Sequence, residues 1–294
     1  MNILEQLKSI TNEENIFVNE PMKKHTTFRT GGNADYLVTP TSKEEIIELL
    51  KIDISKTVIG NGSNLLVKDG GIRGLVIQLS KNDRYTINEN VIEAGSGIFV
   101  AKLSQLALKE GLTGLEFACG IPGTLGGAIY MNAGAYGGEM SNVVVETEFL
   151  KENGEIETIT DHQFAYRKSI FQNMNGIILS SRLKLEKGNV DEIKSKMDEY
   201  KTVRNTKQPI NFPSAGSTFK RPEGYFAGKL IEDAGLKGYR IGGAEVSTLH
   251  AGFVINADNA TSKDILELIS YIQKTVNEKF GVNLETEVKI IGED

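Results

Sequence analysis

Two glycine-rich loops contain residue types suited to binding an anionic group. The first glycine loop, GNGSN at 60–64, follows a short apolar run, and the second, at 119–139, has seven glycines in twenty-one residues. Glycine permits backbone conformations in which successive N–H groups face one concave surface, which binds phosphate oxygens. Ser63, Asn64 and Thr124 add side-chain donors. The two loops together favour a cofactor that carries a diphosphate.

The alternative for either loop alone is an ordinary turn. Neither matches the dinucleotide-binding fingerprint of a Rossmann fold, because GNGSNL lacks the third glycine and no long amphipathic helix follows it. In the second loop, Pro122 fixes one turn and Thr124 is placed to cap a helix that begins near Leu125. The N–H groups at such a helix start would face a phosphate.

Three further segments contain candidates for chemistry. In YRKSIF, Arg167 stands beside apolar residues and could form a bidentate pair with a carboxylate or phosphate, or could be an ordinary surface arginine. In PSAGSTFKRP, Ser217 is a candidate hydrogen-bond or proton donor, with a simple turn serine as the alternative. In LETEVKII, the alternation places Glu285, Glu287 and Lys289 on one face of a strand, where a glutamate is often merely exposed.

A serine nucleophile is not favoured. The sequence has no G-x-S-x-G elbow, and neither His162 nor His250 has a context that suggests a catalytic triad. One cysteine, Cys119, excludes an internal disulfide, and three scattered histidines argue against a zinc site, so no metal is expected. We interpret Cys119 and His25 as structural residues.

Composition places the chain among soluble globular proteins. Its 294 residues are 39% hydrophobic and 24% charged, and no apolar run is long enough to span a bilayer. The start, MNILEQLKSITNEEN, is typical of a polar helix rather than a signal peptide. The net charge of −6 argues against nucleic acid or an anionic membrane as partner. These features suggest a reducing cytoplasm.

The elements that must position these residues alternate between helices and short strands. Helices are expected at 42–51, 100–110, 190–206, 227–238 and 261–281, a hairpin turning at Asn153–Gly154, and a last strand at 284–292. HTTFRTGGNADYLVTP predicts a strand pair with a turn at Gly31–Gly32. Pro209 and Pro213 indicate a domain boundary. Long β-branched runs are absent, so the predicted class is α+β rather than a doubly wound sheet.

The order of six motifs resembles a known family. HTTFRTGGNADYLV, GNGSNLLV, GIPGTLGGAIYMNAGAYGGE, YRKSIF, PSAGSTFK and LETEVKIIG follow the pattern of the UDP-N-acetylenolpyruvoylglucosamine reductases, flavoenzymes of bacterial cell-wall synthesis. The resemblance runs from about His25 to Gly292. It is closest to the shorter, second type, because no long insertion separates GIILSSRLKL from PSAGS.

The resemblance implies the fold and the cofactor site. An FAD-binding domain of the vanillyl-alcohol-oxidase (PCMH) type is expected, made of two αβ subdomains at 1–83 and 84–205, followed by an αβ substrate domain at 206–294. FAD is expected to be non-covalent, since His25 lies apart from the flavin-linking positions of related oxidases. The candidate FAD-binding residues are Gly60, Asn61, Gly62, Ser63, Asn64, Gly120, Ile121, Pro122, Gly123, Thr124, Gly126, Gly127 and Gly134.

The resemblance also implies a ping-pong reduction of UDP-N-acetylglucosamine enolpyruvate to UDP-N-acetylmuramate. NADPH reduces the flavin, hydride passes from flavin N5 to C3 of the enol ether, and a proton reaches C2. Arg167 matches the carboxylate-binding arginine, Glu287 a glutamate that acts protonated, and Ser217 the serine that donates the proton. The developing negative charge needs such donors in a dry site.

Two cations complete the implied substrate site. Lys207 matches a lysine near the substrate pyrophosphate, and Arg221 stands where many members have an asparagine. The implied protein is a cytoplasmic monomer with no nucleic-acid or membrane partner. Two alternatives stay open: a flavin oxidase or dehydrogenase of the same fold acting on an alcohol or sugar, and a non-catalytic protein that binds a nucleotide or flavin.

Overall fold

The computed structural model describes residues 2–294, and the chain forms two compact units built from separated stretches of sequence. The first unit comprises residues 1–18, 36–61 and 74–204, and the second comprises 19–35, 62–73 and 205–294. Four elements begin in one unit and end in the other: β1 (Ile16–Pro21), β2 (Asn33–Val38), β5 (Ile72–Gln78) and α5 (Val190–Lys207).

The N-terminal part of the first unit contains α1 (Ile3–Ile10), α2 (Lys43–Lys51) and β3 (Lys56–Ile59). The strands form a sheet in the order β1-β2-β5-β3, with β3 parallel to β5. Its core includes Leu7, Ile46 and Ile77, all fully buried. The helix expected at 42–51 is confirmed as α2, which begins after its N-cap Ser42, whose hydroxyl accepts from the Glu45 N–H.

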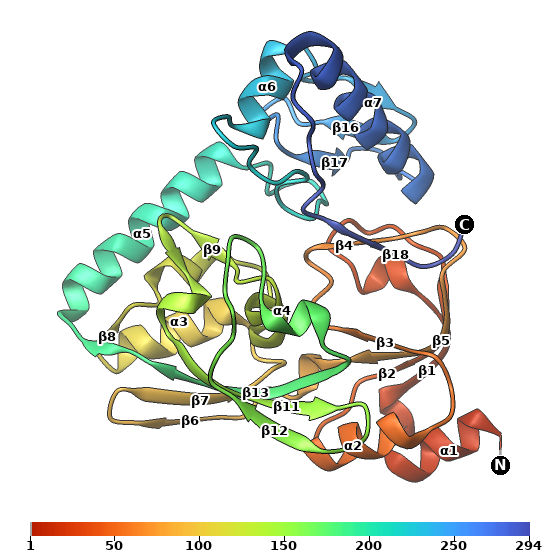
Figure 1. The fold of residues 1–294 in the computed structure, drawn as a ribbon, viewed down its shortest axis with the longest axis vertical. Coiled ribbons are helices and arrows are strands. Elements are labelled where there is room, and N and C mark those ends of the chain that lie inside the picture. Colours follow the sequence, from red (N-terminus) through yellow and green to blue (C-terminus); the bar gives the residue numbers. More distant parts are fainter. Residues whose placement is uncertain (1) are drawn as a thin grey trace. The chain divides into compact units, whose positions relative to one another are not determined.

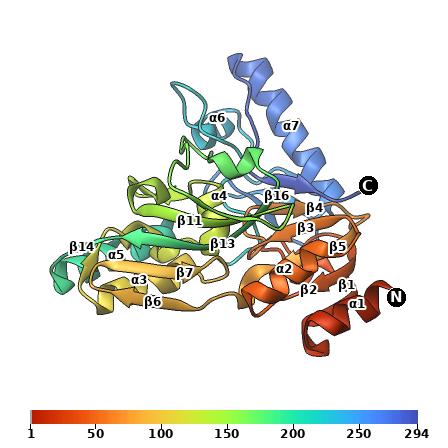
Figure 2. The same ribbon diagram turned by 60° about the horizontal axis from the view of Figure 1, so that its bottom comes forward.

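A five-stranded antiparallel sheet organises the rest of the first unit. Its order is β12-β11-β13-β7-β6, and Figure 2 shows β11, β13, β7 and β6 in succession. Helix α4 packs against β7 and β13. The bounds are β6 (Tyr85–Asn88), β7 (Val91–Gly95), α3 (Val100–Lys109), α4 (Leu125–Tyr130), β11 (Val144–Lys151), β12 (Ile156–Ile159) and β13 (Gly176–Lys184).

Short elements complete the first unit. Strand β8 (Leu112–Thr113) pairs with β14 (Glu186–Lys187), and β9 (Gly134–Ala135) pairs with β10 (Gly138–Glu139). The predicted hairpin between β11 and β12 is confirmed, and Gly154 in its turn has φ 87°. Single 3₁₀ turns across the chain are η1 (Glu13–Asn15), η2 (Met22–Lys24), η3 (Leu79–Lys81), η4 (Glu116–Gly120), η5 (Met140–Asn142) and η6 (Ile170–Asn173).

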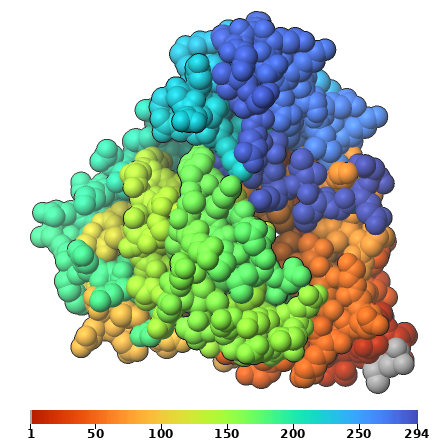
Figure 3. Space-filling view, in the orientation of Figure 1, coloured from red at the N-terminus to blue at the C-terminus, as the bar shows by residue number. Residues whose placement is uncertain are grey.

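The second unit is a small α+β structure in which α7 covers a three-stranded sheet (Figure 1). Its own core includes Phe28, Leu66, Ile269 and Val288. The C-terminal strand returns to pair in parallel with β4, and its atoms lie at the surface in Figure 3. The bounds are β4 (Leu65–Val67), α6 (Ala227–Asp233), β15 (Arg240–Ile241), β16 (Ala244–Val246), β17 (Val254–Asn256), α7 (Ser262–Phe280) and β18 (Lys289–Ile291).

Two strand predictions from the sequence are wrong in extent, because the structure has less strand in each region than was predicted. Residues 25–30 form no strand, and β2 lies beside β1 (Ile16–Pro21) instead. The last strand begins only at Lys289, so Glu285 and Glu287 precede it and do not share a strand face with Lys289. None of the helices in the described part of the chain combines the length and apolar character that crossing a bilayer requires.

Candidate active site

In the first unit the start of the first glycine loop lies against the second glycine loop. The Asn61 side-chain amide donates a 2.6 Å hydrogen bond to the carbonyl of Pro122. A Cβ atom at Gly60 would lie 2.2 Å from Oγ1 of Thr124, so only glycine fits there without displacing the buried threonine. Gly60 and Asn61, at the start of the first glycine loop, therefore share one surface with the second glycine loop.

This surface has unused hydrogen-bond donors. Within residues 2–294, the main-chain N–H groups of Asn61, Gly123, Thr124 and Gly127 have no hydrogen-bond partner. Thr124 is the N-cap residue of α4, as predicted, but its side chain does not cap the helix. Buried N–H groups are nearly always paired, and Gly123 and Thr124 are buried. The residues present therefore fit an anionic ligand such as the FAD diphosphate.

Other predicted cofactor residues have their main chain engaged within the protein. The Ile121 N–H donates to the Ala118 carbonyl, and the Gly126 N–H donates to the Ser96 carbonyl. A Cβ atom at Gly126 would lie 2.8 Å from the Ser96 Cβ. At Gly120 the neighbouring atom would be Cδ of Arg204, also at 2.8 Å. Close packing against Ser96 explains why Gly126 is a glycine, whereas at Gly120 the flexible Arg204 side chain could move aside.

The rest of the first glycine loop, residues 62–64, belongs to the second unit and also has main-chain N–H groups without a partner within residues 2–294. Gly62 has φ 64°, and a Cβ atom there would lie 2.1 Å from the His25 carbonyl oxygen. In the described part of the chain no partner exists for the N–H groups of Gly62, Ser63 and Asn64. These donors fit the same kind of anionic ligand.

Two threonines next to this segment were missed by sequence reasoning. The N–H of Thr27 donates to the Gly62 carbonyl, and the buried hydroxyls of Thr27 and Thr30 have no partner in the protein. The signal was present in HTTFRTGG, but its alternation was interpreted as a strand. Both hydroxyls are candidates for contact with a bound ligand.

Arg167 occupies a strained position in a tight turn of the first unit. Ala165 and Lys168 exchange two main-chain hydrogen bonds, of 3.1 and 3.0 Å, across Tyr166 and Arg167. Arg167 has φ 56°, a conformation in which residues other than glycine are uncommon. Its guanidinium donates to the Gly134 carbonyl at 3.3 Å and lies 5.1 Å from the Tyr166 ring centroid. Such strain is concentrated at functional sites.

Side chains missed by sequence reasoning hold this turn. The Asn132 amide donates to the Ala165 carbonyl at 3.1 Å, and Asn132 is fully buried with φ 43°. The Gln172 amide donates to the carbonyls of Arg167, at 3.0 Å, and Tyr130, at 2.9 Å. These bonds explain how an arginine is kept in a conformation that glycine prefers.

The second unit brings the segment of Ser217 beside the segment of Glu287. The Glu287 N–H donates to the Thr218 carbonyl at 2.9 Å, and Phe219 forms a bridge with Thr286. Asn64 lies there too, because its amide donates to the Glu287 carbonyl at 3.2 Å. Three predicted site residues from distant motifs are thus gathered in one place.

The Ser217 hydroxyl is available to a ligand. The residue is exposed, and within residues 2–294 its hydroxyl has no hydrogen-bond partner. Gly216, just before it, has φ 76° with open space where a Cβ would stand. The serine therefore sits at a turn and can present its hydroxyl outward.

The two predicted substrate cations are exposed in this unit. Lys207 is the last residue of α5. The Arg221 guanidinium carbon lies 4.0 Å from the centroid of the Phe226 ring, and Phe226 is 61% exposed. Stacking on an aromatic ring orients a guanidinium.

The remaining reactive side chains are structural in their surroundings. Burial lowers the pKa of His162, whose Nε2 lies 2.9 Å from Oγ1 of Thr147. Burial likewise lowers the pKa of His250, and it raises the pKa of the Cys119 thiol, which keeps that thiol unreactive. Residues 2–294 hold no group of three or more His, Cys, Asp or Glu side chains arranged to bind a metal ion.

Comparison with known proteins gives the family. Residues 34–160 match an FAD binding domain, and residues 208–291 match the C-terminal domain of UDP-N-acetylenolpyruvoylglucosamine reductase. A reductase of that name from Caldanaerobacter subterraneus subsp. tengcongensis is 52% identical over 297 residues, covering 99% of this chain and 98% of the relative. One from Clostridium perfringens is 49% identical over 300 residues, covering 100% and 99% of the two chains.

A solved structure agrees with the sequence relatives. The crystal structure of UDP-N-acetylenolpyruvylglucosamine reductase (MurB) from Thermus caldophilus superposes with a TM-score of 0.80 at 36% identity, covering 94% of this chain and 97% of that one. The predicted α+β class, with an FAD-binding domain and a C-terminal domain, is confirmed. The unpaired donors along the two glycine loops agree with an FAD-binding protein, and the relatives match this chain over nearly the full length of both sequences. The chain therefore belongs to the UDP-N-acetylenolpyruvoylglucosamine reductase family.

Proposed function

We propose that this chain catalyses the NADPH-dependent reduction of UDP-N-acetylglucosamine enolpyruvate to UDP-N-acetylmuramate, with Arg167, Ser217 and Glu287 as its catalytic side chains. When bound, FAD supplies the redox chemistry, accepting a hydride from NADPH and giving one to carbon C3 of the enol ether. The observation that carries the proposal is the hydrogen bond from the Glu287 N–H to the carbonyl of Thr218, which follows Ser217. That bond fixes a hydroxyl and a carboxyl on adjoining backbones.

Ser217 donates the proton to carbon C2. Its exposed hydroxyl, with no partner in the described protein, is free to point at a substrate atom. A free alcohol is a weak acid, so the serine needs a reaction partner that becomes strongly basic. The carbon next to the carboxylate becomes basic as hydride arrives at C3. General acid catalysis of this kind contributes about 10²–10⁴-fold.

Arg167 and Glu287 stabilise the negative charge that develops on the enolpyruvyl carboxylate. A guanidinium matches a carboxylate with two parallel hydrogen bonds. Glu287, in its protonated form, donates a third hydrogen bond. Donors held in place before the reaction stabilise a transition state most, because no reorganisation is then needed. The strained turn around Arg167 supports such a fixed role.

The remaining groups bind rather than react. The two glycine loops hold the FAD diphosphate without a covalent bond, through the unpaired N–H groups of Asn61, Gly123, Thr124 and Gly127 and those of 62–64. Lys207 and Arg221 bind the substrate diphosphate. Residues 206–294 form the substrate domain, and 1–83 and 84–205 the two parts of the FAD domain. The enzyme acts as a cytoplasmic monomer without nucleic acid or membrane partners.

Anaerobic stopped-flow spectroscopy tests this function. The purified protein should be yellow, bleach on mixing with NADPH, and regain its colour when the enolpyruvyl nucleotide is added. A colourless protein that cannot take up FAD would exclude the proposal. Rapid recolouring by oxygen with no response to the nucleotide would instead indicate a flavin oxidase of the same fold. Binding of FAD or a UDP-sugar without turnover would indicate a non-catalytic protein.

A further inference from the structure

Thr218 is held on three sides by the protein. Its N–H donates to the Gly252 carbonyl at 2.9 Å, and its carbonyl accepts from the Glu287 N–H at 2.9 Å. Its Oγ1 accepts from the Val254 N–H at 3.0 Å. The residue has no exposed surface at all. Thr218 therefore joins the 250–254 segment to the segment of Glu287.

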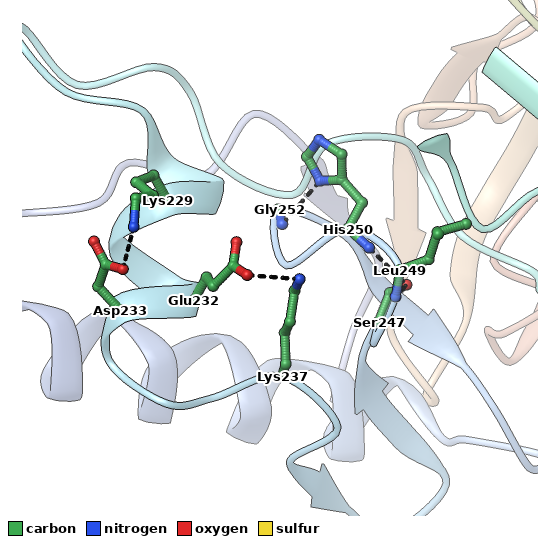
Figure 4. A network of polar contacts seen from close by, with 8 residues as sticks. All are labelled: Lys229, Glu232, Asp233, Lys237, Ser247, Leu249, His250 and Gly252. Carbon is green, nitrogen blue, oxygen red and sulfur yellow. Dashed lines mark hydrogen bonds and ion pairs between the residues drawn. The ribbon is translucent and has the colours of Figure 1, made fainter. Parts of the chain in front are cut away.

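The 250–254 segment is itself fixed. The Gly252 N–H donates to Nδ1 of His250 at 3.1 Å, and the Ser247 hydroxyl oxygen accepts from the N–H groups of Leu249 and His250 (Figure 4). The bond to Nδ1 requires the neutral form of His250, which burial favours. The charged side chains acting on this ring are Lys237 and Glu232, which pair with each other at 2.8 Å. Thr218 is thus bonded to a rigid turn.

Ser217 lies between Thr218, which the protein holds in place, and Gly216, whose backbone is more flexible. Gly216 on its other side has φ 76° and open space where a Cβ would stand, so no side-chain packing at Gly216 restrains the serine. The position of the Ser217 hydroxyl therefore depends on the peptide that links it to Thr218. A shift of about 1 Å in a catalytic group can cost on the order of 10²-fold in rate.

We infer that Thr218 is a positioning residue, which sets the place of the Ser217 hydroxyl relative to Glu287 through its side-chain bond to the Val254 N–H. This inference rests on the proposed function of Ser217. The hydroxyl is essential because Val254 is buried, and a buried N–H that loses its acceptor is strongly disfavoured. Valine has the shape of threonine without an acceptor, whereas serine keeps the acceptor.

The test uses the FAD-loaded enzyme and its two half-reactions. We expect Thr218→Val to leave flavin reduction by NADPH unchanged and to slow reoxidation by the enolpyruvyl nucleotide about 10- to 100-fold. Thr218→Ser should stay within about threefold of the wild-type rate, since it keeps Oγ1. Thr158→Val, at an exposed position of β12, is the matched control and should change neither half-reaction.

Hydrogen exchange supplies a readout that does not depend on turnover. The peptide that contains the Val254 N–H should exchange faster in Thr218→Val than in Thr218→Ser, with or without FAD. If Thr218→Val does not fold, His250→Phe removes the acceptor for the Gly252 N–H and should slow the same half-reaction. Unchanged reoxidation in Thr218→Val, or equal slowing of both half-reactions, overturns the inference.

Ser217→Ala, measured in parallel, separates the two claims. If Ser217→Ala slows reoxidation and Thr218→Val does not, the positioning role is wrong and the proposed function stands. If Ser217→Ala leaves reoxidation intact, the proton-donor role fails whatever Thr218→Val does.

Discussion

The Glu287 N–H donates a 2.9 Å hydrogen bond to the carbonyl oxygen of Thr218. Two segments from distant parts of the sequence therefore lie side by side. The Phe219–Thr286 bridge and the bond from the Lys220 N–H to the Glu285 carbonyl join the same two segments. The backbone positions of Ser217, the candidate proton donor, and Glu287, the candidate carboxyl donor, are consequently fixed relative to each other. Displacing either segment would move both side chains.

Replacing Ser217 by alanine should separate the half-reactions. We expect Ser217→Ala to be reduced by NADPH at the wild-type rate and to be reoxidised by the enolpyruvyl nucleotide about 10²- to 10⁴-fold more slowly, because only the second step needs a proton donor. Stopped-flow absorbance measures both. Ser214→Ala, in the same PSAGS segment, is the control and should behave as wild type. Equal loss of both half-reactions would argue against the proposed role.

Replacing Arg167 by glycine should cost function without costing stability. The left-handed conformation at φ 56° is disfavoured for arginine by about 1–2 kcal/mol, and glycine removes that strain. We therefore expect the Tm of Arg167→Gly to equal or exceed that of wild type, while substrate reoxidation slows by about 10²-fold or more. Lys168→Ala, at the next position of the turn, serves as control. A large fall in Tm together with normal reoxidation would contradict the assignment.

Replacing Gly62 by alanine should release FAD. The new Cβ would meet the His25 carbonyl oxygen at 2.1 Å, so the backbone of the first glycine loop must move. Gly154→Ala is a matched control, because Gly154 also has positive φ, at 87°, but has open space around it. Both variants carry the conformational cost of about 1 kcal/mol, or about 2–4 °C in Tm. Flavin absorbance per protein should fall only in Gly62→Ala; full occupancy would show that this loop does not hold the cofactor.

Stability should fall on acidification through two histidines, the buried His162 and the half-buried His250. Burial lowers the pKa of His162 and of His250, so below about pH 6.5 the unfolded chain binds protons that the folded chain does not. Their contribution is complete above that pH and is lost as the pH falls toward the lowered folded pKa, by at most about 1.4 kcal/mol per pH unit for each histidine. Urea unfolding between about pH 5 and pH 8 measures the slope.

Variants of the two histidines test whether they cause the pH dependence of the unfolding free energy. His162→Asn and His250→Asn should each reduce the dependence of the unfolding free energy on pH, and the double variant should reduce it further. A slope that is the same in wild type and the double variant would mean that other groups titrate on unfolding.

Local signals in the sequence predicted much of the fold. Ser42 before an amphipathic run marked the start of α2, Gly111 with φ 64° marked the end of α3, and Asn153–Gly154 marked a hairpin. Each signal acts within a few residues, so sequence alone contains it. A glutamate three residues after an N-cap often bonds back to the N–H of the cap residue, but the Glu45 carboxylate accepts from the Thr41 N–H at 2.7 Å instead.

Contacts between distant segments could not be predicted in the same way. Asn64 was expected beside a diphosphate, but nothing in GNGSN indicates that its amide reaches the Glu287 carbonyl. Asn132 and Gln172 appear in the sequence as ordinary polar residues, and only the folded chain shows that they hold the turn of Arg167. The sequence alone does not show that these motifs come together, because their contacts form only in the tertiary structure. Their shared role was therefore inferred from the family resemblance.

The pairing of β18 with β4 has a consequence for the order in which the protein folds during synthesis. The Lys289 N–H donates to the Asn64 carbonyl, so the first glycine loop is tied to a segment far along the chain. N-terminal segments can fold as soon as they leave the ribosome. The Asn64–Glu287 part of the site can form only after the segment around Glu287 has also emerged, so it assembles later than the N-terminal structure.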